Sequence, residues 1–235
     1  MRDLPLIAGL LTLAIMAAAA IWLGKSSDML RDAEPTDFGG AKPSPNGEYR
    51  RPYSLAQSQM TWWFCIVLGS FVCIALGKFF GGHLDNLSNI LTEQSLILMG
   101  IGTGTALGAT IIEQVKQPAA GDPPKTTLDK FKAVLTAIKA LQDAGQPIPA
   151  EMIKNRDDLA AKLASQNFFN DILTDVDGIS LHRFQSMIWT VIIGVAFLVV
   201  VFTSGAMPKL DALVLAVLGI SAGTYLGFKV PEQPA

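Results

Sequence analysis

Five stretches of this sequence contain no Asp, Glu, Lys, Arg or His, and each is 16 to 20 residues long. A membrane-spanning α-helix needs about 20 mostly apolar residues, whereas a membrane β-strand alternates apolar and polar positions over about 10. Only 16% of the chain is charged, against about 25% in an ordinary soluble domain. These features exclude a soluble globular enzyme and a β-barrel. The sequence predicts an all-α, polytopic membrane bundle with five transmembrane helices, over residues 4–23, 62–77, 94–112, 187–206 and 212–228.

The first stretch lies at the N-terminus and allows two interpretations. A secretory signal peptide would place its cleavage site near Ala18–Ala20. A retained anchor over residues 1–24 is favoured, because Asp3 offsets Arg2 and the apolar stretch is longer than the usual 7–15 residues of a signal peptide.

Aromatic and basic residues predict how the spans lie in the membrane. Four tryptophans near the span ends are candidate interface anchors: Trp22, Trp62, Trp63 and Trp189. The connections 24–61 and 113–186 hold five and nine basic residues, whereas the short loops hold only Lys78 and Lys209. The positive-inside rule therefore predicts cytoplasmic connections, an N-terminus outside and a cytoplasmic C-terminus.

Residues 53–113 resemble residues 179–235, which indicates an internal repeat. Ser54 and Trp63 match Ser180 and Trp189 at an offset of 126, and residues 100–108 match 219–227 at an offset of 119, with six of nine positions identical. Both units enter and leave the membrane on the same side in the predicted topology. We therefore expect tandem parallel repeats of two-helix units, related by an axis along the membrane normal.

Each repeat carries three glycines spaced by four in its second helix. Glycines four apart share one helix face and allow close helix packing in lipid. We expect these glycine ladders to pack helices together, within one chain or across a homo-oligomer: Gly100, Gly104 and Gly108, and Gly219, Gly223 and Gly227. The alternative is a pore lined by nearby hydroxyls: Thr103, Thr105, Ser221 and Thr224.

The two long connections differ in composition. Residues 25–52 are rich in Pro, Gly, Ser and charge, so we expect a polar linker without regular structure. Residues 121–178 predict a small cytoplasmic helical insertion with three amphipathic helices. The first is capped by Thr126 and Asp129 and ended by Gly145, and the second starts at Pro149. The third apolar stripe contains Phe168, Phe169, Ile172, Leu173 and Val176.

No motif for catalysis, a cofactor or a metal is visible in the sequence. Asp175, Asp177 and Gly178 resemble part of a calcium loop, but Leu173 and Phe184 stand where ligands are required. We therefore expect Asp177–Gly178 to end a helix and Ser180 to cap the next. None of the five stretches contains an ionisable residue, which argues against an ion-coupled transporter.

The residues Ser180–Gln185, then Trp189, then Gly219–Glu232 resemble a pattern found in a group of bacterial inner-membrane proteins. The resemblance covers the two repeats and leaves out the first 50 residues. It implies a bacterial inner (plasma) membrane location and no particular activity.

These observations lead to two functional hypotheses. The first is a non-enzymatic membrane scaffold or anchor that self-associates through the glycine ladders and presents residues 125–177 to a cytoplasmic protein partner. The alternative is a homo-oligomeric ion channel lined by glycine and threonine of the third and fifth helices. The net charge of −2 argues against nucleic acid as a partner.

Overall fold

The computed structural model describes residues 4–33, 35, 37–41, 48–81, 90–115, 126–175 and 178–229. Helices dominate this part of the chain, which confirms the prediction of an all-α multi-pass membrane protein. Five helices are long and apolar enough to cross a membrane: α1 (Leu4–Ser26), α2 (Leu55–Phe80), α3 (Glu93–Val115), α7 (Leu181–Ser204) and α8 (Ala212–Lys229).

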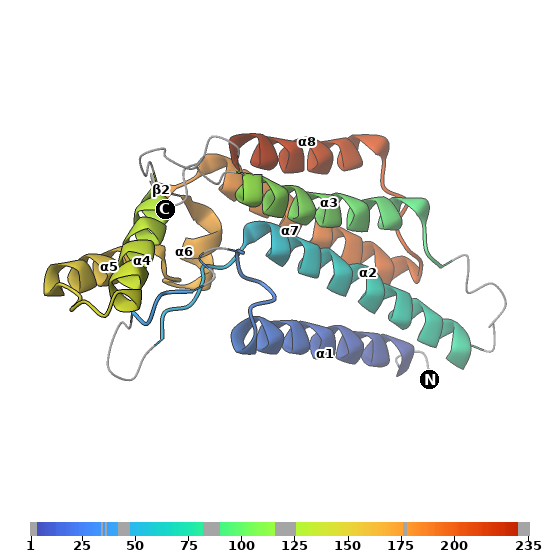
Figure 1. The fold of residues 1–235 in the computed structure, drawn as a ribbon. Helices are drawn as coiled ribbons and strands as arrows, with labels where there is room; N and C mark the ends of the chain where they lie inside the picture. Colours follow the sequence, from blue (N-terminus) through green and yellow to red (C-terminus); the bar gives the residue numbers. More distant parts are fainter. Residues whose placement is uncertain are drawn as a thin grey trace.

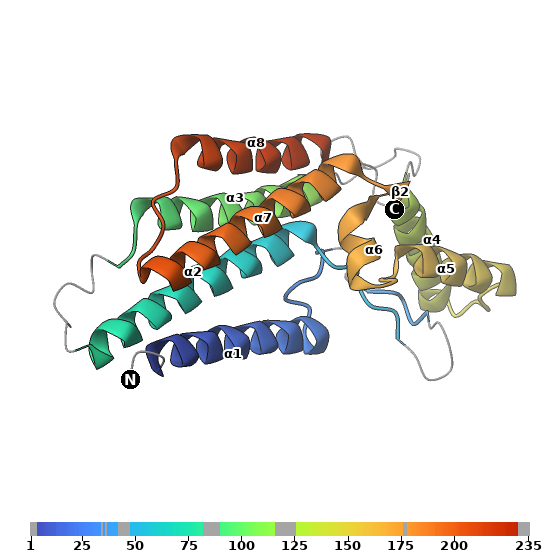
Figure 2. The ribbon, with the colours of Figure 1, turned by 180° about the vertical axis from the view of Figure 1, so that it is seen from behind.

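Four of these helices form a bundle, and α1 packs along the outside of α2 (Figures 1 and 2). The order around the bundle is α2, α3, α8, α7, so α2 lies beside α7 and α3 lies beside α8. Helices α2 and α7 run in the same direction, and so do α3 and α8 (Figure 1). The two antiparallel hairpins, α2–α3 and α7–α8, therefore lie side by side with corresponding helices in contact.

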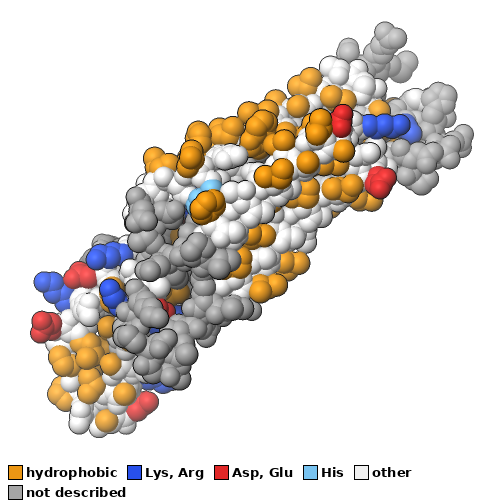
Figure 3. All heavy atoms as spheres, turned by 90° about the horizontal axis from the view of Figure 1, so that it is seen from above, with side chains coloured by type: hydrophobic (Ala, Val, Ile, Leu, Met, Phe, Trp, Pro, Cys, Tyr) orange, Lys and Arg blue, Asp and Glu red, His pale blue; other side chains and the backbone are white. Residues whose placement is uncertain are grey.

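The bundle is apolar inside and outside. Its core holds branched and aromatic side chains that include Ile66, Val67, Ile74, Leu98, Ile193, Phe197 and Val201. Large apolar side chains are exposed on the outer faces of the five long helices. On the face shown in Figure 3, apolar side chains are spread along the bundle, whereas the charged side chains lie toward its two ends. An apolar outer surface of this kind is suited to contact with lipid.

Polar residues stand at the start of the bundle helices. Ser54 and Ser180 directly precede α2 and α7 in extended conformation, but neither side chain makes a capping hydrogen bond. The Ser180 hydroxyl instead lies 2.8 Å from His182 Nδ1, so the predicted side-chain cap at Ser180 is wrong. The Asp211 carboxylate accepts a hydrogen bond from the Leu213 N–H at 3.2 Å, at the start of α8. A carboxylate stabilises this end of a helix because the first turn has unpaired N–H groups and a positive dipole end.

Helices α4 (Thr127–Asp143) and α5 (Ala150–Leu163) form a hairpin at one end of the bundle (Figure 1). The predicted capping box is confirmed, because the Thr126 hydroxyl accepts from the Asp129 N–H at 3.0 Å and the Asp129 carboxylate accepts from the Thr126 N–H at 3.1 Å. The chain leaves α4 through Gly145, whose φ of 66° suits a residue without a side chain. Pro149 directly precedes α5.

Residues 37–41, which lie within the predicted linker, pack against this hairpin. Phe38 is 9% exposed, and its ring centroid lies 6.1 Å from that of Phe131. The Arg156 guanidinium donates a hydrogen bond to the Gly39 carbonyl at 3.0 Å. We call α4, α5 and residues 37–41 the end unit. Its packing was not predicted, because one aromatic residue among polar ones creates no helical or strand period.

The third predicted helix of the insertion is shorter than expected, and this part of the prediction is corrected. Only α6 (Phe168–Leu173) is helical, and β1 (Thr174–Asp175) then pairs antiparallel with β2 (Gly178–Ile179). Gly178 has a φ of 110°, which a residue with a side chain rarely adopts. Asp177 and Val176 lie outside the described residues. Ile172 is buried against the first turn of α2, so α6 joins the insertion to the bundle.

We expect Phe38→Ala to destabilise the end unit, because removing a buried phenylalanine ring typically costs about 3–5 kcal/mol. Limited trypsin digestion of the full chain should then cut faster at the exposed Lys139 and Lys154. Phe169→Ala is the matched control, because it removes the same ring from a side chain that is 65% exposed. Equal cleavage rates for wild type and Phe38→Ala would show that residues 37–41 do not stabilise the unit.

Candidate functional site

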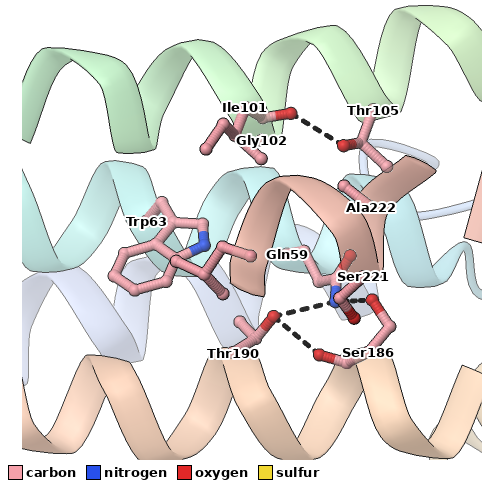
Figure 4. Close-up of a pocket in the computed structure, with 10 residues that line it drawn as sticks. Gln59, Trp63, Ile101, Gly102, Thr105, Ser186, Thr190, Ser221 and Ala222 are labelled. Atoms are coloured by element: carbon pink, nitrogen blue, oxygen red, sulfur yellow. Dashed lines mark hydrogen bonds between the residues drawn. The ribbon is translucent and has the colours of Figure 1, made fainter. Parts of the chain in front are cut away.

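A group of buried polar side chains connects α2 to α7 inside the apolar bundle. The Gln59 amide nitrogen, Nε2, donates hydrogen bonds to Ser186 Oγ and Thr190 Oγ1, each at 2.9 Å (Figure 4). Thr190 Oγ1 in turn donates to the Ser186 carbonyl at 2.9 Å. All three residues are less than 9% exposed. We call Gln59, Ser186 and Thr190 the polar hub.

The helical geometry explains why one glutamine reaches two partners. Ser186 and Thr190 are four residues apart and therefore lie one above the other on the same face of α7. Gln59 lies in the second turn of α2 and faces them across the helix contact. A buried amide without partners costs several kcal/mol in an apolar medium, so these bonds are a condition for burying Gln59.

A small cavity of about 10 Å³ lies beside the polar hub and is lined by all four bundle helices. The Ser221 hydroxyl of α8 is buried at the cavity wall and has no hydrogen-bond partner in the structure. On α3, Thr105 Oγ1 donates to the Ile101 carbonyl at 2.7 Å. Ten residues line the cavity, and most are labelled in Figure 4: Gln59, Trp63, Ile101, Gly102, Thr105, Ser186, Thr190, Leu218, Ser221 and Ala222.

Apolar residues lie next to the cavity on both sides along the bundle axis. The core that includes Trp63, Ile66 and Leu218 lies toward the end farther from the end unit. A second apolar cluster, which includes Leu55, Ala106 and Tyr225, lies toward the end unit. Within the described residues, apolar clusters thus border the polar centre on both sides along the bundle axis.

The structure separates the four hydroxyls that were predicted to line a pore. Thr105 and Ser221 line the same cavity, and they are 3% and 5% exposed. Thr103 lies on the exposed surface of α3. Thr224 is partly buried and does not line this cavity. The four hydroxyls therefore do not form one continuous lining in the protomer.

The ladder glycines lie mainly on exposed helix faces. A Cβ atom placed on Gly108 would lie 2.9 Å from Leu226 of α8, so this glycine makes a close contact within the chain. The other five have nothing within 4 Å of that position: Gly100, Gly104, Gly219, Gly223 and Gly227. Packing of the ladders within one chain is thus limited to Gly108, and packing across copies stays a prediction.

Close helix contacts in the protomer use other glycines, which sequence reasoning missed. A Cβ on Gly194 of α7 would lie 2.5 Å from Trp62 Nε1 of α2. A Cβ on Gly102 of α3 would lie 3.4 Å from the Met60 backbone, and Gly9 of α1 faces Cys73 of α2 at closer range. Each is a single glycine in an apolar stretch, so no repeated spacing distinguishes it.

The four tryptophans have different environments. Trp22 is 67% exposed and Trp189 is 37% exposed, and their place at a membrane interface stays a prediction. Trp63 is 3% exposed and packs in the bundle core, so its side chain does not have the exposed position that was expected of an interface aromatic. Trp62 is partly buried against Gly194. The ring of Trp63 faces Gly102, and this neighbour on another helix could not be read from local sequence.

Buried positive charges lie where the bundle meets the insertion. Arg183 in the first turn of α7 and Lys229 at the end of α8 are 9% and 5% exposed. The Arg183 Cζ atom lies 5.9 Å and the Lys229 Nζ atom 5.7 Å from the Tyr225 ring centroid. Contact with an aromatic face attracts a cation and reduces the cost of burying it. Lys229 Nζ also donates to the Tyr225 hydroxyl at 3.4 Å, so Tyr225 contributes to the stability of both buried cations.

Among the described residues, no group of three or more His, Cys, Asp or Glu side chains could hold a metal ion. Comparison with protein-family models, with curated protein sequences and with solved structures finds no match. The polar hub and its cavity are therefore interpreted from their geometry alone.

We expect Gln59→Leu to lower the stability of the protein by about 1–2 kcal/mol, because hydrogen bonds between membrane helices contribute about 0.6 kcal/mol each on average and up to about 1.7. Unfolding of the full chain in detergent micelles, monitored by circular dichroism, measures this change. Gln185→Leu is the matched control, because Gln185 occupies the corresponding position on α7 and is exposed. An equal effect of both substitutions would contradict the role assigned to the polar hub.

Proposed function

We propose that the protein is a non-enzymatic integral membrane scaffold of the bacterial inner membrane. In this proposal, copies of the chain associate through the ladder faces of α3 and α8, and each copy presents the end unit to a cytoplasmic protein partner. The observation that carries the proposal is the exposure of five ladder glycines without neighbours in the protomer. Helices in lipid associate through such small-residue faces because close backbone approach supplies the packing contacts.

The exposed faces combine grooves with large apolar side chains. On α3, Leu107 and Ile111 are 60% and 59% exposed beside the ladder. On α8, Ile220 is 67% exposed and lies between Gly219 and Gly223. A second helix can fill a glycine groove with such side chains, so these faces suit self-association.

The helix boundaries support the proposed parallel repeat. Helices α2 and α7 begin at Leu55 and Leu181, 126 residues apart, and α3 and α8 begin at Glu93 and Ala212, 119 residues apart. These separations equal the two sequence offsets of the repeat. Because corresponding helices are adjacent and run in the same direction, the second hairpin lies beside the first as the next member of a row.

This arrangement suggests how the row continues into a second copy. Within one chain, Leu226 of α8 packs against Gly108 of α3. Their repeat counterparts are Leu107 and Gly227: Leu107 is 60% exposed, and Gly227 has nothing within 4 Å. We propose that Leu107 of one copy packs against Gly227 of the next. Such a head-to-tail contact generates a ring or an open filament.

We expect Leu107→Ala and Gly227→Leu each to weaken self-association by about tenfold or more, since a loss of about 1.4 kcal/mol of contact energy changes an equilibrium constant tenfold. Mass photometry of the detergent-solubilised protein across a dilution series measures the change. The double variant Gly227→Leu with Leu107→Gly places the large side chain on α8 and the glycine on α3. This exchange should recover part of the association.

Leu11→Ala and Ala18→Leu are the matched controls for this experiment, because both residues are exposed on α1, away from the ladder faces. They should leave the oligomer unchanged. Wild-type association by both ladder variants would refute the proposed contact.

The scaffold proposal is tested against the channel alternative by flux measurements. We expect liposomes that contain the purified full chain to show no selective flux of sodium or potassium. Selective flux that disappears in both Thr105→Val and Thr224→Val would overturn the scaffold proposal in favour of a channel. Replacing residues 127–163 by a flexible linker should abolish the recovery of a protein partner from native membranes, while the ladder contact is retained.

A further inference from the structure

We propose that the cavity beside the polar hub binds one water molecule as a permanent part of the bundle. In this site the water links Ser221 of α8 to Gln59 of α2 and Thr105 of α3. The site lies inside one protomer, so it does not depend on self-association or on any partner.

The cavity has room for at most a single water. The space open to the centre of a water molecule is about 10 Å³, at the lower end of the roughly 10–15 Å³ that one buried water needs. Cavities that remain empty in proteins are lined by apolar groups alone. This cavity is lined by five side chains with hydroxyl or amide groups, on all four helices: Gln59, Thr105, Ser186, Thr190 and Ser221.

The Ser221 hydroxyl is the orphaned polar group that a water in this cavity would satisfy. It is 5% exposed and lacks a hydrogen-bond partner, although serine in a helix can often donate to the carbonyl four residues earlier. An orphaned hydroxyl in an apolar environment costs about 1–3 kcal/mol, and buried waters typically satisfy such groups. Figure 4 shows Ser221 beside Gln59 at the cavity.

The donors and acceptors around the cavity are complementary to water. Both partners of the Gln59 amide nitrogen are already in place, which leaves the amide oxygen as an acceptor. The Thr105 hydroxyl proton is engaged with Ile101, which leaves the lone pairs of Thr105 Oγ1. A water can donate to these two oxygens and accept from Ser221. Three hydrogen bonds are the typical number for a buried water.

The same donor set argues against a bound cation. Only neutral oxygens face the cavity, and no carboxylate is among its lining residues. A hard cation such as calcium takes six to eight oxygen ligands. Burying a charge at membrane depth without a countercharge is costly. Water satisfies the same oxygens without a net charge.

The water would complete a hydrogen-bond network across the whole bundle. The polar hub joins α2 to α7 directly. Through the water, the network extends to α8 and α3, so that both hairpins are held at one depth relative to each other. Water-mediated bonds are nearly as favourable in enthalpy as direct ones.

The sign of the Ser221→Ala effect tests the proposal. If a water is bound, the substitution removes one of its partners and should lower the unfolding midpoint of the full chain in detergent micelles by about 2–4 °C, the shift expected for one lost hydrogen bond in a protein of this length. If the cavity is empty, removing an orphaned hydroxyl leaves the midpoint unchanged or raises it.

Ser70→Ala is the matched control. Ser70 of α2 is fully buried and its hydroxyl also lacks a partner, but it does not line the cavity. We expect Ser70→Ala to leave the midpoint unchanged or to raise it. A midpoint for Ser221→Ala that follows this control would overturn the water site.

Two further measurements use the wild-type chain. Solid-state NMR of the protein in liposomes should show magnetisation transfer from water to the Gln59 side-chain nitrogen. The unfolding midpoint should be the same in sodium chloride and in choline chloride of equal concentration. Absence of the transfer overturns the proposal, and so does a midpoint that rises with sodium alone, since that result identifies a bound cation.

Discussion

A polar side chain inside an apolar bundle must find its hydrogen-bond partners within the protein, because lipid provides none. The placement of Gln59 depends on this constraint, and so does the relation of α2 to α7. Sliding α7 by one turn, about 5.4 Å, would carry Ser186 or Thr190 out of reach of the amide. Apolar cores in general tolerate repacking, whereas these two hydrogen bonds, at 2.9 Å each, require one register of α7 against α2. Specificity in this fold therefore comes from a few polar atoms, and cohesion comes from the many apolar ones.

The glycines of this chain lie in two kinds of environment. Gly102 and Gly194 lie where two helices of the same protomer touch, and a side chain at either position would meet a neighbouring helix. The ladder glycines Gly219 and Gly223 lie where the protomer ends. A regular glycine spacing is visible in a sequence because it extends along a helix. Contacts within the protomer are local, so isolated glycines are sufficient.

The sequence predicted the elements of this fold better than their contacts. Uncharged stretches located all five membrane-length helices, and the Thr126–Asp129 pattern located the start of α4, because both signals are local. The fate of Trp63 depended on a neighbour in α3, which local sequence does not specify. Only part of the candidate site could be predicted from the sequence. Thr105 and Ser221 were identified as hydroxyls at membrane depth, but their convergence on Gln59 needed the order of the helices around the bundle.

The end unit connects parts of the chain that are made at different times. Phe38 precedes its core neighbour Phe131 by more than 90 residues, and both helices of the first hairpin lie between them. At about 5–20 residues per second, a ribosome needs on the order of 5–20 s to cover that distance. During this interval the Phe38 ring has no core to enter, while α2 and α3 are already available for insertion. The end unit consequently closes late in biogenesis. A stable end unit requires that the first hairpin, α2 and α3, has returned the chain to the side of the membrane from which that hairpin started.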